Sequence, residues 1–564
     1  MYSPVLSIPA RRVSGWVAET DPRYARAWLA SLPLANSAES AREIYQALYT
    51  VNRIELRVQT RMELLDLYEP VVASTCSALA SYLMNAAPPL GAKKRQLAEF
   101  IRRLHIEMGY GYKCCLRDLS HTRLMFGKRA RFARCIERAL FHSSEVLLRS
   151  YVVYIPCTES AWRETHELYR LAESLGLTGD ALKVDSESVV RSVTVGERYV
   201  QTLLLGLANP YQLPQNGAQQ VHAFLTRWGG KAHVVPVTPA SDVSGLFLID
   251  LVADAAPVPF SGDATESNES RRLLDVRELL QTLRAFVSRL DNGESIEKLS
   301  LGVDVLDSTC SELLHRMLRS WGDTARRRYA RRQQSSNVFV CSGMNALRFF
   351  VNGQRPFTPY LPTPNTAGMS ALAVGVADVA FVELDDAAQA AFDLDNEPSE
   401  VKPASLVTES YRVDRWQLRD IGPQGMSLAR YGDAATPMRV GDLIGVQQPS
   451  DLGRWRAAVI RWVKSPETDS LEMGLEVLAA SVAPVAVRPA TGQNAVTWRG
   501  ALRLPASDVA CRPATLLVAR GTSNVGDELD LFDEQEEPRR VRVLRLLERT
   551  GSFEQIVYAD IARH

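Results

Sequence analysis

The sequence predicts a multidomain α+β protein with an N-terminal array of helices, a central mixed α/β segment and two small antiparallel β-barrels. Two observations carry this prediction. Over roughly the first 230 residues, apolar side chains return every three or four positions, which is the period of an amphipathic helix. From residue 411 onward, strand-like runs recur at about 8 to 14 residues with turn residues between them, as in a small barrel. A chain of 564 residues has room for roughly three to four such domains.

Charge and hydropathy exclude two broad classes of function. Lys plus Arg and Asp plus Glu are both 65, so no global positive field favours nucleic acid or an anionic membrane. Any anion site must therefore be local. The first 16 residues lack the pattern of a secretory signal, and apolar runs such as Ala371 to Val382 fall short of the roughly 20 residues that span a bilayer. We expect a cytoplasmic protein without membrane insertion and without nucleic acid as a partner.

Motifs for catalysis and metal binding were not found. The eight cysteines are scattered apart from the adjacent pair Cys114 and Cys115, which predicts structural thiols rather than a metal or redox site. The run that begins at His105 lacks the second histidine of a zinc-protease helix. The chain also has no phosphate-binding loop, dinucleotide fingerprint or nucleophile elbow. We expect no catalytic residues, no metal and no cofactor; an enzyme of unrecognised type remains the least favoured alternative.

The N-terminal domain is predicted at residues 1–229. Short breaks between its helices, such as the Ala-Pro-Pro-Leu-Gly run at 87–91, imply antiparallel neighbours. Such an array is typical of a scaffold that binds a protein partner. The expected helices are Ser40 to Leu56, Thr60 to Met84, Lys93 to Met108, Ala130 to Val153 and Ser160 to Leu175.

One of these helices carries a repeat-like spacing. The residues Trp162, His166, Tyr169, Ala172 and Gly176 resemble the first helix of a tetratricopeptide repeat, but no convincing copy follows 34 residues later. The alternative is an ordinary amphipathic helix whose tryptophan and tyrosine are core residues. A tetratricopeptide-like array is thus one interpretation of this region, and an ordinary helical array is the other.

A mixed α/β segment is predicted at 230–325. After Gly229 and Gly230 the chain changes character, because residues 232–237 and 245–252 are typical of short buried strands. Two amphipathic helices are expected next, at about 270–291 and 303–321. An arginine-rich run at 326–332 closes the segment.

Two barrels are predicted in the last third of the chain. The first is expected at 326–481, with an insertion at about 352–410 that is rich in Pro, Thr, Ala and acidic residues. A Pro/Ala/Val linker at 482–491 then leads to a second small barrel at 494–564. The expected strands are 337–341, 411–419, 426–430, 439–447, 455–463 and 471–478 in the first barrel, and 495–504, 514–519, 527–532, 540–547 and 553–559 in the second.

The first barrel carries a motif with a recognisable spacing. Asp420, Gly422 and Gly425 in Trp416-Gln-Leu-Arg-Asp-Ile-Gly-Pro-Gln-Gly resemble the second motif of the PilZ family, an Asp or Asn, a Ser two positions on and a Gly three beyond that. The strand entry at 440–445 and the runs 459–463 and 472–478 are similar to later strands of that family. The resemblance covers a whole small domain and implies a receptor for cyclic di-GMP that relays the nucleotide to a protein partner, in bacterial motility, pili, exopolysaccharide or biofilm control.

The family's first motif, Arg-x3-Arg ahead of the first strand, has two registers in the arginine-rich run. One is Arg328 with Arg332, and the other is Arg327 with Arg331. A strand-like stretch follows at 337–341, as the family pattern requires. The resemblance therefore implies that these arginines, together with Asp420, Gly422 and Gly425, bind the nucleotide.

The chemistry of the ligand suits these residue types. Cyclic di-GMP offers two phosphates and two guanines, and guanidinium groups pair bidentately with phosphate oxygens and with the O6/N7 edge of guanine. Side chains at i and i+4 point the same way on a helix and on a strand, so Arg-x3-Arg presents two forks together. The Asp420 carboxylate can accept from a guanine N1–H and amine, while Gly425 allows close backbone approach or a positive φ.

Three features keep an alternative open, namely a nucleotide-blind scaffold with a degenerate PilZ domain. Gly422 stands where the family has Ser, which removes one hydroxyl worth about 0.5–1.5 kcal/mol. The insertion between the two motifs is long, and the arginine run is also typical of a solvated helix C-terminus. Arg412 and Arg415 form a further candidate pair, although alternation along the strand favours a plain surface role for them.

Overall fold

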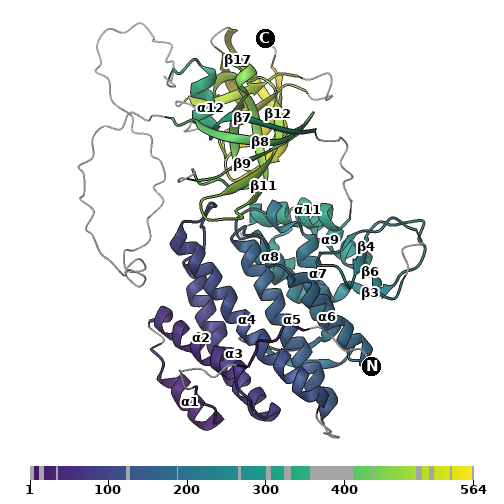
Figure 1. Cartoon of the computed structure of the whole chain (residues 1–564). Helices are drawn as coiled ribbons and strands as arrows, with labels where there is room; N and C mark the ends of the chain where they lie inside the picture. The colour runs from purple at the N-terminus through teal and green to yellow at the C-terminus, as the bar shows by residue number, and fades with distance from the viewer. Residues whose placement is uncertain are drawn as a thin grey trace, which may run out of the picture. The chain divides into compact units, whose positions relative to one another are not determined.

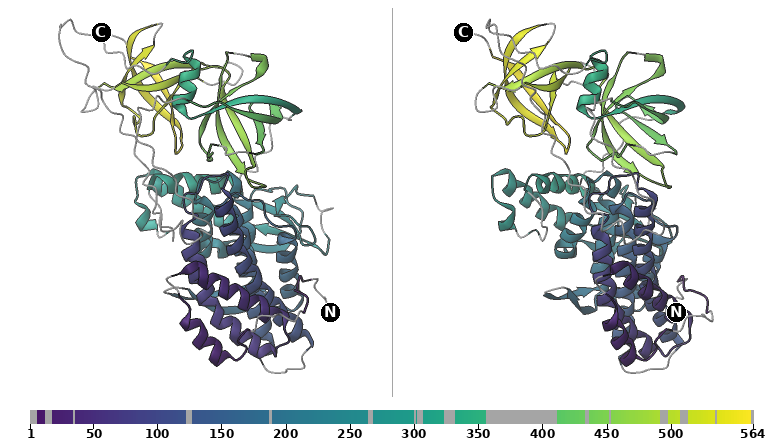
Figure 2. Two further views of the ribbon diagram at one scale, coloured as in Figure 1. Left: turned by 60° about the vertical axis from the view of Figure 1, so that its left-hand side comes forward. Right: turned by 90° about the vertical axis from the view of Figure 1, so that its left-hand side faces the viewer.

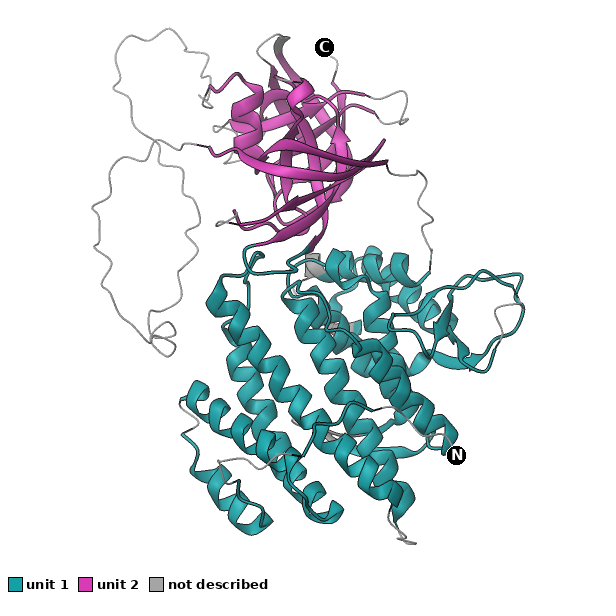
Figure 3. Cartoon of the chain, viewed as in Figure 1, with its two compact units in different colours: residues 1–328, 464–469 teal, residues 329–463, 470–564 magenta. Residues whose placement is uncertain are grey.

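The computed structural model describes residues 6–11, 18–33, 36–121, 127–186, 189–263, 268–299, 301, 307–322, 332–355, 411–432, 436–451, 453–490, 498–506, 513–533 and 536–561. The chain divides into two compact units (Figure 3). The first comprises Met1–Arg328 with Lys464–Asp469, and the second comprises Tyr329–Val463 with Ser470–His564. Most of the predicted insertion, residues 356–410, lies outside the described residues.

Helices build most of the first unit (Figure 1). Each of the five helices predicted from apolar periodicity is present, and the longest, α4, packs along α5. The periodicity works because each helix contributes its apolar stripe to one large buried cluster. The helices are α1 (Pro22–Ser31), α2 (Ser37–Arg53), α3 (Val58–Ser81), α4 (Ala92–His121), α5 (Lys128–Val152), α6 (Ala161–Ser174), α7 (Val195–Leu207) and α8 (Gly217–Trp228).

Helix α4 runs well beyond its predicted end at Met108. Gly109 and Gly111, which follow the predicted end, both lie inside the helix. A Cβ on Gly111 would come within 2.5 Å of a Leu65 methyl carbon in α3. The glycine therefore lets α3 and α4 approach closely. This reason for a glycine inside a helix depends on the neighbouring helix, so the sequence of α4 alone does not reveal it.

The repeat-like residues of α6 are core residues. Trp162 and Tyr169 are buried in the main cluster of the unit. His166 is fully buried, with its Nδ1 2.7 Å from the Tyr199 hydroxyl and its Nε2 2.9 Å from the Ala255 carbonyl oxygen. These contacts support the interpretation as an ordinary amphipathic helix.

A four-stranded antiparallel sheet and three helices complete the first unit. The strand order is β3-β6-β4-β5. The helix expected at 270–291 was wrong over its first residues, because Arg271–Asp275 is strand β6, which pairs with β3 on one side and β4 on the other. The elements are β3 (His233–Pro236), β4 (Leu246–Asp250), β5 (Val258–Pro259), β6 (Arg271–Asp275), α9 (Arg277–Asp291), α10 (Ile296–Leu299) and α11 (Asp307–Trp321); a separate hairpin joins β1 (Ala181–Ser186) to β2 (Val189–Thr194).

The second unit contains two closed six-stranded barrels, which confirms the two predicted barrels and adds one strand to the second (Figure 2). The first closes in the order β10-β11-β12-β9-β8-β7, and its strand β7 comes from before the predicted insertion. Trp416, Leu418 and Leu428 are among the side chains buried within it. Its strands are β7 (Arg332–Ser342), β8 (Asp414–Gly422), β9 (Gly425–Arg430), β10 (Leu443–Gln447), β11 (Arg456–Lys464) and β12 (Leu471–Ala479).

The second barrel closes in the order β13-β14-β15-β18-β17-β16. Its first strand lies where a linker was expected, so the linker prediction was wrong over Ala483–Pro489. The linker was predicted because the segment contains prolines. Pro484 and Pro489 lie near the two ends of the strand, where they interrupt the ladder of hydrogen bonds least. The strands are β13 (Ala483–Pro489), β14 (Arg499–Leu504), β15 (Thr515–Val518), β16 (Glu528–Asp533), β17 (Glu536–Arg549) and β18 (Glu554–Asp560).

The two barrels share a hydrophobic core. Helix α12 (Met344–Val351), which the sequence did not predict, contacts strands of both barrels. Leu347 of this helix and Leu443 of the first barrel pack in one buried cluster with Leu502 and Phe553 of the second. Arg461 reinforces the junction, since its guanidinium pairs with Glu548 of β17 as well as with Glu476. The second unit is therefore one packed body.

Among the described residues, no helix has the length and apolar character required to cross a bilayer. Six of the seven described cysteines are buried, and all seven are free thiols.

Candidate ligand-binding site

The hairpin β8–β9 holds the second predicted motif. Gly422 pairs with Gly425 across the two-residue turn Pro423-Gln424, and Ile421 pairs with Met426. Both glycines lie at strand ends beside the turn, and neither has a positive φ. Gly425 also pairs with Glu476 of β12, so its backbone is extended and buried within the sheet. The motif is therefore presented on a strand end and a tight turn.

Asp420 is fixed by a residue that the sequence analysis missed. Ser427 lies directly opposite it on β9, and the Ser427 hydroxyl donates to Asp420 Oδ2 at 2.7 Å. Ser427 is only 6% exposed. The family places a serine where this chain has Gly422, so the hydroxyl comes here from the neighbouring strand. Hairpin register would have revealed it, since a turn at 423–424 sets 420 against 427.

Strand alternation places this pair on the outer surface of the barrel. Leu418 and Leu428 are opposite one another and point into the buried interior. The ladder then shifts register between Leu418 and Asp420. Ser427 follows Leu428 in the alternation and therefore faces outward, and Asp420 faces outward with it. The irregularity at Arg419 thus keeps the outward row of β8 continuous from Arg415 to Asp420.

Strand β7 brings the first motif to the same place. Gln333 is directly opposite Asp420 and shares its face of the sheet, whereas Arg332, the first residue of the strand, is opposite Ile421 and leaves the strand on the other face. Arg332 is exposed and has no ion-pair partner among the residues that the structure describes. The structure thus joins two segments about ninety residues apart in sequence. The other arginines of the predicted motif, Arg327, Arg328 and Arg331, lie outside the described residues.

The row of outward-facing residues that includes Asp420 and Ser427 continues onto β12. Gly474 is the partner of Ser427, and the indole of Trp462 lies against it so closely that a Cβ would come within 1.8 Å of the indole Nε1. Glycine is required here, because any side chain would displace the ring. The outer surface therefore carries one row of groups across four strands. In order, these are the amide of Gln333, the carboxylate of Asp420, the hydroxyl of Ser427, and Gly474 beneath the ring of Trp462.

Of the further candidate pair, Arg412 is in an ion pair, whereas Arg415 has none in the described part of the chain. Arg412 Nε lies 2.9 Å from Asp414 Oδ1, and Arg430 approaches the other oxygen of the same carboxylate at 2.9 Å. Arg412 is therefore already paired with a carboxylate. Arg415 is exposed and makes no ion pair within the described part of the chain.

The arrangement can bind an anionic, planar ligand. At the end of the barrel, Arg332 supplies an exposed guanidinium on a long flexible stem for a phosphate or a guanine edge, and Asp420 on the adjoining strand supplies an acceptor for ring N–H groups. The described residues contain no cluster of three or more His, Cys, Asp or Glu side chains that could hold a metal ion. The site is suited to binding rather than to metal chemistry.

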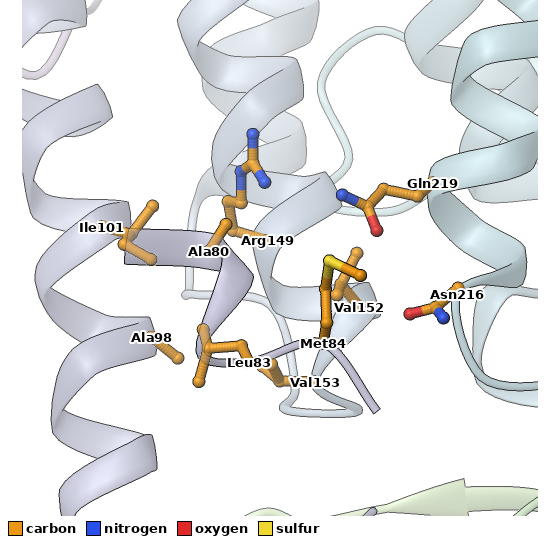
Figure 4. A pocket seen from close by; sticks show the side chains of 10 residues that line it. All are labelled: Ala80, Leu83, Met84, Ala98, Ile101, Arg149, Val152, Val153, Asn216 and Gln219. Atoms are coloured by element: carbon orange, nitrogen blue, oxygen red, sulfur yellow. The ribbon is translucent and has the colours of Figure 1, made fainter. Parts of the chain in front are cut away.

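A cavity in the first unit offers no comparable chemistry (Figure 4). Its walls include Leu83, Met84, Ile101 and Val152. Its charged group, Arg149, is already paired with Glu145 at 2.8 Å. We interpret it as a gap in helix packing.

Comparisons with known proteins agree with this organisation. Residues 23–239 match a family model described as the N-terminal domain of the cyclic-di-GMP receptor FimW. Residues 246–484 match the model of its middle PilZ domain, and residues 485–561 match that of its C-terminal beta-barrel domain. The chain is 27% identical to the cyclic-di-GMP receptor FimW of Pseudomonas aeruginosa over 561 residues, which cover 96% of this chain and 90% of that protein. No solved structure matches.

The boundary between the second and third models, at 484–485, falls within β13. The matched middle domain includes the first barrel and the mixed α/β segment from β4 onward, whereas β3 belongs to the first model. The three models follow one another in the same order along nearly the whole chain. The chain therefore belongs to the FimW family, whose middle domain is a PilZ domain.

Proposed function

We propose that this protein is a cyclic di-GMP receptor, and not an enzyme, that binds the nucleotide on the outer surface of its PilZ barrel. The observation that carries the proposal is the register of β7 on β8, which sets Gln333 opposite Asp420 and so brings the start of β7, with Arg332, to the end of β8 that holds the second motif. The similarity to a relative named as a cyclic-di-GMP receptor supports the same ligand. No cofactor or metal is required for this role.

The residues take distinct roles in the proposed site. Arg332 pairs with a phosphate or with the O6/N7 edge of one guanine. Asp420, oriented by Ser427, accepts from guanine N1–H and the exocyclic amine. The turn between Gly422 and Gly425 lets the backbone approach the ligand. Arg327, Arg328 and Arg331 are proposed to add further guanidinium forks from the segment that precedes β7.

The missing motif serine does not by itself favour a nucleotide-blind scaffold. Gly422 removes a hydroxyl worth about 0.5–1.5 kcal/mol, but Ser427 provides one that contacts Asp420 directly. The acceptor is therefore held in place by a different residue. A scaffold role without nucleotide remains the second candidate function, and the affinity measurement below distinguishes the two.

We further propose that the protein acts in the cytoplasm and passes the signal to a protein partner through its helical region. The helical unit has a large core of its own and presents long helices, as partner-binding scaffolds do. A ligand that binds two states of the protein with different affinities shifts their populations, and this is how nucleotide binding would become a signal.

Equilibrium binding tests the proposal. Purified full-length chain is titrated with cyclic di-GMP, with cyclic di-AMP as the matched control because it keeps the phosphates and changes the bases. We expect saturable binding of cyclic di-GMP and at least tenfold weaker binding of cyclic di-AMP, whose adenines lack the N1–H that Asp420 accepts. Equal affinity would contradict the assigned role of Asp420, and no binding of either would favour the scaffold.

A further inference from the structure

A shallow polar groove crosses the outer surface of the first barrel beside the proposed site. It comprises two adjoining hollows that share Asn337 of β7 and Arg415 of β8. Gln417 and Tyr431 line one hollow, and Phe339 and Gln448 line the other. These side chains belong to the second unit, which is one packed body, so the groove is a fixed feature of it.

The groove lies on the same face as Asp420. Arg415 and Gln417 alternate with the buried Trp416 and Leu418, so they face outward as Asp420 does. Gln417 is three residues from Asp420 along β8, or roughly 10 Å at the usual strand rise. One ligand longer than a single nucleotide can therefore reach both places.

The charge of the groove favours an anion. None of the residues that line the two hollows is an aspartate or glutamate. Arg415 is exposed and unpaired among the described residues, whereas many other arginines of this unit, such as Arg456 and Arg488, are in ion pairs. In a chain with zero net charge, an unpaired guanidinium in an acid-free groove marks a local positive site.

The groove also offers a surface for a flat ring. Tyr431 is 50% exposed, so part of its ring is accessible to a ligand. Arg419 donates to its hydroxyl, and the Arg419 guanidinium carbon lies 5.6 Å from the ring centroid. These contacts hold the ring in one orientation while leaving part of its surface open. The amides of Asn337 and Gln417 supply donors and acceptors for the edge of a base.

We propose that this groove is a second nucleotide subsite, which holds the guanylate half of the ligand distal to Asp420. Arg415 pairs with the phosphate or the guanine edge of that half, and Tyr431 stacks on the base. The inference rests on the proposed function and extends it, because it assigns residues outside both family motifs. The subsite makes Arg415 and Tyr431 determinants of affinity for a dinucleotide.

The affinity of the full chain for cyclic di-GMP, measured for Arg415→Ala, tests the subsite. The matched control is Arg545→Ala, which removes another exposed arginine without an ion pair in the described structure, from the second barrel. We expect Arg415→Ala to weaken binding about tenfold or more, Tyr431→Leu several-fold, and Arg545→Ala less than twofold. Unchanged affinity in both groove variants overturns the subsite, and so does an equal loss in the control.

Chemical modification gives a second readout on the unaltered protein. Phenylglyoxal modifies accessible arginines, and mass spectrometry reports the extent at each position. Saturating cyclic di-GMP should protect Arg415 and leave Arg545 reactive; reactivity of Arg415 that does not change at saturation overturns the subsite. If the wild-type chain does not bind cyclic di-GMP at all, the proposed function itself fails. Binding with normal affinity in the groove variants leaves the proposed function intact and refutes only the subsite.

Discussion

The hydroxyl of Ser427 donates to the carboxylate of Asp420 across β8 and β9, at 2.7 Å. This bond helps to fix the orientation of the carboxylate on the outer surface of the barrel. Ser427→Ala should therefore weaken cyclic di-GMP binding by roughly tenfold, the equivalent of about 1.4 kcal/mol. Calorimetric titration measures it, with Ser427→Thr as the control that keeps the hydroxyl. Full affinity in the alanine variant would show that Asp420 needs no such support.

The contact between Trp462 and Gly474 is expected to be essential to the barrel. A Cβ at position 474 overlaps the indole at 1.8 Å, so Gly474→Ala must displace the ring. Forced repacking of this kind costs about 1–3 kcal/mol, and we expect a lower midpoint of thermal unfolding. Trp462→Leu should recover part of the loss in the double variant, because it removes the overlapping atoms. A Gly474→Ala protein as stable as wild type would contradict the contact.

The two barrels are expected to unfold together. Phe553 of the second barrel is fully buried in a cluster with Leu443 of the first. Phe553→Ala should cost about 3–5 kcal/mol and destabilise both barrels. Hydrogen exchange measures the two barrels separately, because peptides from β9 report on the first barrel and peptides from β16 on the second. The control is Leu544→Ala, at a position that is 51% exposed. Faster exchange in the second barrel alone would show that the barrels are independent.

Acid should destabilise the helical unit in a specific pH range. Burial lowers the pKa of His105 to about 3. The unfolded chain therefore binds a proton below about pH 6.5 that the folded unit does not bind, and stability falls as pH decreases from 6.5 toward 3. The pKa of Glu145, buried beside Arg149, His105 and His222, is lowered to about 2 despite the opposing cost of burial. Its contribution is present above pH 4.5 and is lost as pH falls from 4.5 toward 2.

His105→Gln isolates the histidine's share of this acid sensitivity. The variant should reduce the slope of unfolding free energy against pH between about 4 and 6 by about 1.4 kcal/mol per pH unit, the value for one proton. Urea denaturation followed by circular dichroism at several pH values measures the slope. An identical slope in the variant would mean that His105 is already protonated in the folded unit.

Helix periodicity and strand rhythm predicted most elements because each has one buried face. These patterns failed where contacts between distant parts of the chain determine the secondary structure. Gly111 stays helical because α3 approaches it closely, and β6 is a strand because sheet neighbours lie on both of its sides. Helix α12 was missed because its apolar residues serve the junction between the two barrels.

The candidate site was predicted in its parts but not in its pairing. Asp420 and the Gly422 to Gly425 turn follow from motif spacing, and Arg332 follows from the Arg-x3-Arg pattern. The role of Ser427 depends on the β8–β9 register, and the exposure of Arg415 depends on which carboxylates lie near it. Both are properties of the folded barrel that residue spacing alone does not contain.

Arg332 provides the most direct test that two distant segments form one nucleotide site. Its exposed guanidinium has no ion pair in the described structure, so its loss should affect ligand and not fold. Titration of full-length Arg332→Ala with cyclic di-GMP should show affinity reduced by roughly 10- to 150-fold, for a charge-assisted bond of about 1.5–3 kcal/mol, with an unchanged thermal midpoint without ligand. Wild-type affinity in this variant, or a large loss of stability without ligand, would contradict the assignment.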